Sequence, residues 1–130
     1  YPGRAAEDVA RQWLRLGPRL VIISRGAAGA LAVRGAGSVL HRPAYPAQVT
    51  DTAGAGDAFT AALLGRLYVL GQAGRRIEGL PGRELATLLD QAAAVAGVTC
   101  ERPGADTPTA VEVRLALRAR SRQRDQALAR

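Results

Sequence analysis

The spacing of apolar positions at the start of the chain predicts a helix. Between residues 5 and 16, Val9, Trp13 and Leu16 recur at helical intervals, and two acidic residues stand in the first turn. Gly17-Pro18 ends this pattern. We therefore predict a helix over 5–16 whose apolar face, Trp13 included, packs in the core.

The next apolar positions predict strands. Residues 20–23 form a continuous apolar run without polar alternation, which favours a central strand covered by helices on both faces. Two shorter strands are predicted at 30–34 and 38–41, joined as a hairpin through Gly35-Ala36-Gly37, and a last short strand at 48–50. A helix that leads into such a strand indicates an α/β fold.

The second half of the chain reads as helical. From Asp57 onward the sequence is apolar nearly all round, which predicts a buried helix, and a second buried helix is predicted over 84–98. An exposed connection over 71–82 separates them. A capping box at residues 109–112 predicts the start of a final helix.

Composition excludes several classes of chemistry. The 130 residues are 48% hydrophobic and 22% charged, typical of one globular domain or part of a larger one. All eighteen basic residues are Arg, so lysine-dependent phosphate loops and Schiff bases are excluded. A single Cys (Cys100) and a single His (His41) exclude a disulfide framework and the usual zinc motifs.

The N-terminus carries no targeting pattern. The chain has no Met, so we expect Tyr1 to follow a cut in a longer chain. No apolar run approaches the length of a membrane span, and no signal-peptide pattern is present. We therefore expect a cytoplasmic protein without a membrane partner.

The positive charge is concentrated at the C-terminus. Residues 114–130 hold six Arg against one acidic residue, whereas residues 1–113 are nearly balanced. This contrast suggests a body over 1–113 and an Arg-rich helix end or tail over 114–130. The tail has no aromatic residue to stack on bases, so we favour a solvated helix end and expect no specific nucleic-acid partner.

The segment best suited to ligand binding or catalysis is Asp51-Thr-Ala-Gly-Ala-Gly-Asp57, a small-residue turn that leads directly into a predicted helix. Backbone N–H groups of a glycine-rich turn at a helix N-terminus favour an anion such as phosphate. An ionised Asp57 beside a phosphoryl group can accept the proton of an attacking hydroxyl. The alternative is that Asp57 only caps the helix and the glycines only permit the turn.

The same segment resembles the DTxGAGD signature of the ribokinase (PfkB-type) carbohydrate kinases. Residues 24–29, Ser-Arg-Gly-Ala-Ala-Gly, are similar to the TxGxxG segment of that family, and residues 102–105 to its RxGA loop. The resemblance covers nearly the whole chain but only the C-terminal part of a typical member. It implies an α/β fold, the C-terminal part of a ribokinase-like three-layer α/β/α sandwich.

The resemblance also implies an ATP-dependent carbohydrate kinase with a small-molecule sugar as substrate. Asp57 would be the general base, and the backbone of Gly54, Ala55 and Gly56 would form the anion hole for the γ-phosphoryl group. The residues implied to contact the nucleotide are Ser24, Gly26, Gly29 and Thr52.

Two kinds of metal ion follow from the same resemblance. Mg²⁺ would accompany ATP. A monovalent cation, K⁺ in many members, would bind near Asp51 with backbone oxygens of the neighbouring loops. The residues implied for this cation are Asp51, Ala53, Thr99, Arg102 and Gly104.

The chain departs from the family pattern in two places. Many members carry Asn-Ala-Ala on the penultimate helix, where this chain has Ala92-Ala-Ala94. The N-terminal half of the family, with the sugar-binding glycine pair, the lid strands and the acidic motif that organises Mg²⁺, has no counterpart here. The lid often makes the dimer contact, so a homodimer is an expectation for the full-length protein only. The alternative function is a non-catalytic nucleotide-binding fragment.

Overall fold

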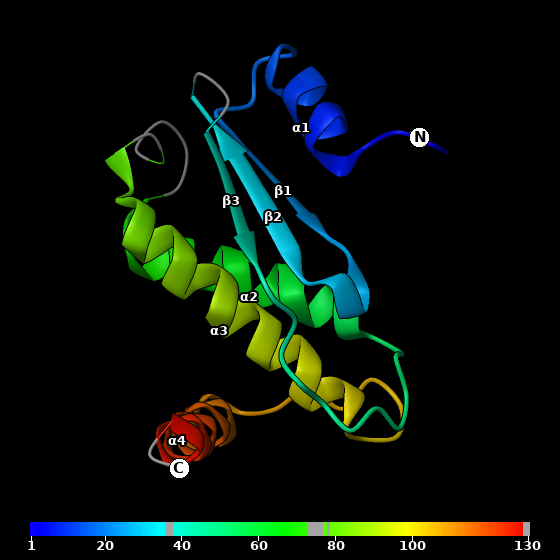
Figure 1. Ribbon diagram of the computed structural model, residues 1–130, viewed down its shortest axis with the longest axis vertical. Coiled ribbons are helices and arrows are strands. Elements are labelled where there is room, and N and C mark those ends of the chain that lie inside the picture. The colour runs from blue at the N-terminus through cyan, green and yellow to red at the C-terminus, as the bar shows by residue number, and fades with distance from the viewer. Residues whose placement is uncertain (36–37, 73–76, 78, 129–130) are drawn as a thin grey trace.

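The computed structural model describes residues 1–35, 38–72, 77 and 79–128 and contains helices on both faces of a small sheet (Figure 1). The helices are α1 (Ala6–Leu14), the short 3₁₀ turn η1 (Gly26–Ala28), α2 (Ala55–Val69), α3 (Gly82–Cys100) and α4 (Ala110–Leu128). The strands are β1 (Leu20–Ser24), β2 (Ala30–Arg34) and β3 (Ser38–Arg42).

The three strands form one antiparallel sheet in the order β1-β2-β3. Ile22 of β1 pairs with Ala32 of β2, which pairs with Leu40 of β3. The predicted hairpin is therefore confirmed, although its tip at residues 36–37 lies outside the described residues. The prediction that residues 20–23 form the central strand is wrong for the sheet as described, because β2 takes that place and β1 lies at an edge.

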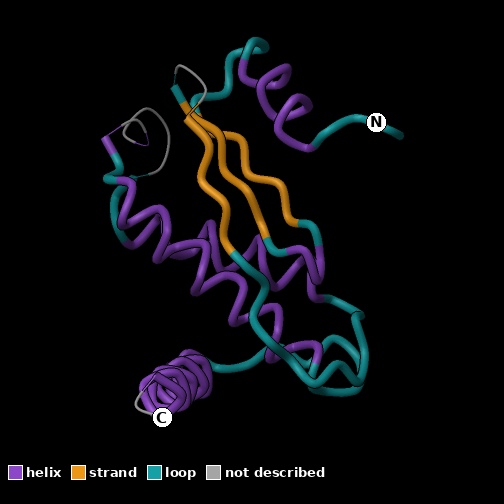
Figure 2. The backbone as a smooth tube through the Cα atoms, viewed as in Figure 1, coloured by secondary structure: helices purple, strands orange, loops and turns teal. Residues whose placement is uncertain are grey.

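Alternate residues of β2 point into two separate apolar clusters. Leu31 and Val33 pack with Ala10 of α1 on one face, whereas Ala30 and Ala32 pack against α2 and α3 on the other. Because side chains of a strand alternate between faces, β2 joins both clusters. The described chain thus has three layers in the order helix, sheet, helices (Figure 2), built around a small antiparallel sheet.

Helices α2 and α3 pack against each other and together cover one face of the sheet. Phe59, Leu63 and Leu67 of α2 are buried there. The prediction that α2 is buried all round is wrong in this structure: Leu64 and Tyr68 are 63% and 80% exposed. The described chain offers α2 one helical neighbour and one sheet face, so the opposite side of the helix has nothing to pack against.

Two further predictions, a strand at residues 48–50 and a core position for Trp13, are wrong. No strand forms at residues 48–50; the N–H groups of Thr50 and Asp51 instead donate to the carbonyl of Cys100, at 2.8 and 3.1 Å. Trp13 is 46% exposed rather than in the core, and its Nε1 donates to the hydroxyl of Tyr1 at 3.0 Å. Part of the predicted connection over 71–82, at 73–76 and 78, lies outside the described residues.

The last helix begins at the predicted capping box. The N–H and hydroxyl of Thr109 donate to Glu112 Oε2 at 2.7 and 2.8 Å. Arg102 joins α4 to the preceding loop through Glu112. The suggested boundary between residues 113 and 114 falls inside α4, which runs without a break to Leu128.

None of the helices in the described ranges has both the length and the apolar character that a membrane span needs.

Candidate functional site

The glycine-rich turn between residues 51 and 57 leads directly into α2. Gly54 is the N-cap of the helix and has φ 73° and ψ −4°, the left-handed conformation. A Cβ added to Gly54 would lie 2.7 Å from Cβ of Ala105, closer than two carbon atoms can approach. Glycine is therefore required here both by the backbone conformation and by the close approach of the 101–105 loop.

The first N–H groups of α2 are left without capping side chains. A glycine N-cap provides no side-chain acceptor, and the first i→i−4 bond of this turn runs from Ala58 N–H to the Gly54 carbonyl at 2.8 Å. The N–H of Ala55 donates a long hydrogen bond to the Thr52 carbonyl, at 3.3 Å. The N–H groups of Gly56 and Asp57 come before the first i→i−4 bond of the helix. These donors and the helix dipole favour an anion at this end of α2.

Asp57 does not cap the helix. It is the third residue of α2, and its side chain is exposed and accepts no hydrogen bond from the part of the chain that the structure describes. The alternative reading of Asp57 as an N-cap is therefore wrong, because Gly54 holds that position. The carboxylate remains available to a group that approaches the first turn of α2 from outside.

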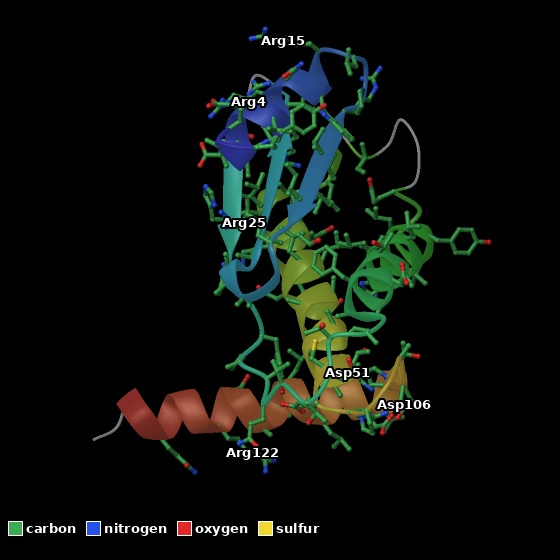
Figure 3. All side chains as sticks on the ribbon, turned by 90° about the vertical axis from the view of Figure 1, so that its right-hand side faces the viewer. Arg4, Arg15, Arg25, Asp51, Asp106 and Arg122 are labelled. Carbon is green, nitrogen blue, oxygen red and sulfur yellow. The ribbon has the colours of Figure 1, made fainter. Side chains whose placement is uncertain are left out.

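Asp51 fixes the other end of the turn. Its Oδ1 accepts the N–H of Ala53 at 3.0 Å, and its Oδ2 accepts the N–H of Gly104 at 2.8 Å. These two backbone hydrogen bonds, that of Ala53 first, hold the pKa of Asp51 below its usual value. One charged carboxylate thus ties the turn to the loop after α3, as its place near the end of α3 in Figure 3 shows.

The five residues implied for a monovalent cation lie in these two adjoining segments. Thr99 is buried, and its hydroxyl donates to the Val95 carbonyl at 2.8 Å. The guanidinium of Arg102 pairs with Asp106 and Glu112. Asp51 is the one carboxylate of this donor set, and hard monovalent cations bind such oxygen ligands.

The turn between β1 and β2 approaches the same region. Ser24 ends β1, and Gly26 and Gly29 both have positive φ, at 55° and 81°. A Cβ on Gly29 would lie 2.1 Å from the carbonyl oxygen of Arg42, so this glycine allows the turn to lie directly against the chain that leaves β3. The N–H of Arg25 closes the turn on the Gly29 carbonyl at 2.7 Å.

A cavity of about 640 Å³ lies between these segments. Its volume is within the range of about 300–1,000 Å³ usual for small-molecule sites. Six of the predicted residues line it together: Ser24, Gly26, Gly29, Thr52, Ala55 and Gly56. Gly54, Asp57 and the five residues implied for a monovalent cation are not part of its lining.

Sequence reasoning missed the rest of the cavity wall. Tyr45, with Pro43 and Pro46 on either side of it, comes from the loop after β3, and Ala93 and Gly97 come from α3. An aromatic residue among prolines and a glycine inside an apolar helix were the available signals. Cys100, the single thiol, is half-buried and also lines this cavity.

No cluster of three or more His, Cys, Asp or Glu that could hold a metal ion occurs within the described ranges. The site therefore consists of backbone N–H donors, small side chains and one aspartate at each end of the turn, Asp51 and Asp57. This arrangement suits an anion with a proton acceptor beside it.

Comparison with known proteins shows the family of the chain. The model of the pfkB family of carbohydrate kinases matches residues 2–111, most of the chain. The chain belongs to this family. The match ends just after the first residue of α4, so it includes the glycine turn, the cavity and the loop after α3.

Individual known kinases are similar to the chain in sequence or in structure. A fructokinase from Klebsiella pneumoniae is 44% identical over 63 residues, which is 48% of this chain and 20% of the fructokinase. An aminoimidazole riboside kinase from Salmonella enterica, solved with aminoimidazole riboside and an ATP analogue, is 34% identical with a TM-score of 0.68. This structural match covers 89% of this chain and 37% of that kinase.

A ribokinase from Thermotoga maritima is 26% identical with a TM-score of 0.69, over 88% of this chain and 35% of the ribokinase. The chain therefore spans 35–37% of the length of these solved kinases and 20% of the fructokinase, and its α/β fold aligns with part of the solved kinases.

Proposed function

We propose that the chain is the nucleotide-binding and base-bearing part of an ATP-dependent carbohydrate kinase with a ribokinase-like three-layer sandwich. The observation that carries this proposal is the start of α2: an uncapped helix N-terminus opens on a cavity, with an exposed carboxylate on its first turn. Membership of the pfkB family supports the reaction class.

Each residue of the turn has a distinct part in this proposal. The N–H groups of Gly54, Ala55 and Gly56 stabilise negative charge on the transferred phosphoryl group, because preorganised backbone donors need no reorganisation during the reaction. Asp57 accepts the proton of the sugar hydroxyl as that oxygen bonds to the γ-phosphorus and the bond from this phosphorus to the departing ADP oxygen breaks. Ser24, Gly26, Gly29 and Thr52 hold the nucleotide phosphates in the adjoining cavity.

The proposed cofactors are MgATP and a monovalent cation. MgATP supplies the phosphoryl group, and the charge of the magnesium ion lowers the repulsion between phosphates and nucleophile. K⁺ would sit beside Asp51, with backbone oxygens of Ala53, Thr99, Arg102 and Gly104. There it would hold the turn and the loop after α3 together, as the hydrogen bond from Gly104 to Asp51 already does.

The direct test is phosphoryl transfer by wild type and by Asp57→Asn. With MgATP and a panel of fructose, ribose and aminoimidazole riboside, Asp57→Asn is expected to lower turnover about 10²- to 10⁴-fold, the usual contribution of a general base. Its affinity for ATP should stay unchanged, since the carboxylate lies outside the cavity lining. Near-normal turnover in this variant would contradict the assignment.

A second candidate is a non-catalytic nucleotide-binding fragment. The observation that favours it is length, since the chain spans 35–37% of the solved relatives compared here. Binding of ATP without phosphosugar formation, with every sugar of the panel, would select this candidate. Failure to bind ATP at all would contradict both candidates.

A further inference from the structure

The end of β3 is held against α3 by an ion pair outside the cavity lining. Arg42 donates from Nε to Asp90 Oδ1 at 2.8 Å and from Nη2 to Asp90 Oδ2 at 2.5 Å. Arg42 is the last residue of β3, and Asp90 lies in the middle of α3, where the strand approaches the helix in Figure 1. Two parallel hydrogen bonds between a planar guanidinium and a carboxylate fix orientation as well as distance. The pair therefore restrains the end of β3 relative to α3.

The backbone of Arg42 supports the turn between β1 and β2. A Cβ on Gly29 would lie 2.1 Å from the Arg42 carbonyl oxygen and 2.8 Å from backbone atoms of the next two residues, so the turn lies directly on this stretch of chain. Arg42 is also the register partner of Ala30, the residue after Gly29. Because close-packed groups leave no spare space, a displacement of the chain at Arg42 displaces the turn with it.

Each partner of the ion pair stands next to the cavity without lining it. Pro43 follows Arg42 and belongs to the lining, and so does Ala93, which comes about one helical turn after Asp90. The turn over residues 24–29, which rests on Arg42, contributes to the lining on the strand side. One ion pair thus joins the strand side of the cavity to its α3 side.

The surroundings of the pair favour a positional role over a contribution to stability. The side chains of Arg42 and Asp90 are 33% and 39% exposed, and ion pairs with this exposure are screened by water and usually add little to the free energy of folding. Pro43 has no N–H, so the residue that follows β3 cannot donate a backbone hydrogen bond to the sheet. The side-chain pair is a restraint that the backbone does not supply at this residue.

We propose that Arg42 and Asp90 are positioning residues for nucleotide binding: their ion pair holds the turn over residues 24–29 where this turn and the start of α2 contact the same run of phosphates. The inference rests on the proposed function, because it takes the cavity as the nucleotide site. It adds two residues that lie outside the motifs at 24–29, 51–57 and 102–105.

The sign of one substitution separates positioning from simple electrostatics. Asp90→Asn removes a negative charge near a site for a polyanion, so Coulomb attraction alone would strengthen the binding of MgATP. Loss of the bidentate pair should instead weaken it, because the turn is no longer held in place. We expect the dissociation constant for MgATP, measured on the full chain at constant ionic strength, to rise by about 3- to 30-fold.

Glu7→Gln is the matched control. Glu7 is 40% exposed and pairs with Nε2 of His41, the residue before Arg42, at 2.8 Å, and with Arg11 at 3.6 Å. It therefore ties the same strand to α1, on the face of the sheet away from the cavity. The control should bind MgATP as wild type does. The urea midpoints of Asp90→Asn and Glu7→Gln should be similar, because both variants lose a partly exposed ion pair.

Arg42→Lys tests the geometry of the pair from its other side. The substitution keeps the positive charge, but an ammonium group cannot make the two parallel hydrogen bonds of a guanidinium. It should therefore weaken MgATP as Asp90→Asn does. Wild-type affinity in Arg42→Lys would show that charge alone suffices and would overturn the inference.

A double variant tests whether the two side chains act as one unit. Arg42→Gln alone should weaken MgATP, and Arg42→Gln combined with Asp90→Asn should be no weaker than the worse single variant, because one interaction can be lost only once. Losses that add would show two independent roles and would contradict a positioning pair.

Backbone amides show where the change acts. In ¹⁵N-labelled Asp90→Asn, saturation with MgATP should still shift the amides of residues 54–56, whereas the shifts at Gly26 and Gly29 should be smaller than in wild type. A general loosening of the fold would not select the turn over residues 24–29. Equal reduction at both segments would therefore contradict the inference.

Failure of this inference and failure of the proposed function are distinct results. A wild-type chain that does not bind MgATP contradicts the proposed function, and the inference falls with it. If wild type binds and Asp90→Asn binds more tightly, or less than about threefold more weakly, the inference is overturned and the proposed function stands. Equal weakening in Asp90→Asn and Glu7→Gln also overturns it, because the loss would then follow from either carboxylate that contacts β3.

Discussion

Gly54 and Gly56 of the turn before α2 differ in the space that a side chain would have there. Gly54 has φ 73° and its Cβ position is blocked by Ala105, whereas nothing lies within 4 Å of a Cβ on Gly56. The first glycine is needed to build the turn. The second leaves the backbone bare on the side where a phosphate is proposed to approach.

This difference predicts opposite effects of alanine at the two positions. Gly54→Ala should lower the free energy of unfolding by about 1–3 kcal/mol, through a strained backbone and a close contact. Gly56→Ala should leave it unchanged or raise it by up to about 1 kcal/mol, because alanine favours the helix. Urea denaturation of the two variants measures both values.

Nucleotide titration of the same variants separates stability from binding. Gly56→Ala should keep the fold and weaken MgATP, since its methyl group stands near the proposed phosphate position. A Gly56→Ala variant that binds MgATP as tightly as wild type would contradict a phosphate at the start of α2. Equal loss of stability in both variants would contradict the geometry of the turn.

At the scale of elements, the start of α4 depends on an ionised carboxylate, that of Glu112. Glu112 accepts hydrogen bonds from the N–H and the hydroxyl of Thr109 and pairs with Arg102, and these contacts lower its pKa to about 2. A group whose pKa is lower in the folded state contributes stability above its unfolded pKa, about 4.3 for Glu, and loses that contribution as the pH falls toward the folded value.

We therefore predict that Glu112→Gln destabilises the chain at pH 6 and that this difference from wild type shrinks between pH 4.5 and pH 2. Unfolding by urea, followed at several pH values in both proteins, gives the difference directly. The result would contradict the account if the gap stayed constant or grew as the pH was lowered, because the contribution of Glu112 depends on its charge.

The elements that the sequence predicted well are those decided by neighbouring residues. The hairpin through Gly35, the capping box at Thr109 and the helix after the glycine turn all depend on local chemistry, and all are present. The predictions for β1 and α2 failed because an apolar sequence indicates a need for burial without showing what covers it. Leu64 and Tyr68 are exposed although the sequence around them predicted a buried helix.

The same distinction holds for the site. Ser24, Gly29 and Gly56 were recognised from local motifs, and the cavity brings them together. Tyr45 and Gly97 were not recognised, because their contact joins two segments far apart in the chain and needs the packing of the loop on α3. A local motif determines the conformation of a turn, whereas this wall of the cavity forms only when the loop after β3 packs on α3.

At the scale of the whole molecule, the cavity and α4 lie apart. Helix α4 lies at the end of the molecule below α3 (Figure 1), and none of its described side chains belongs to the cavity lining. Glu112, through Arg102, and the buried Val113 are two of the residues that connect α4 to the rest of the chain. Both residues precede the Arg-rich segment.

Removal of residues 114–130 should therefore leave nucleotide affinity within about threefold of wild type, because the capping box and Val113 remain. Circular dichroism checks that the shortened chain folds, and titration with MgATP gives the affinity. Loss of binding in a folded, shortened chain would mean that α4 supports the cavity. Salt-sensitive RNA binding by the full chain, lost on shortening, would support a nucleic-acid function for the tail instead.

The central claim is that phosphates bind at the start of α2, and backbone amides report this directly. In the ¹⁵N-labelled 130-residue chain, titration with MgATP should produce its largest amide shifts at Gly54, Ala55 and Gly56, followed by Gly26 and Gly29. Amides of the α4 segment should not move. Saturable binding that shifts α4 and leaves the Gly54–Gly56 amides in place would contradict the account.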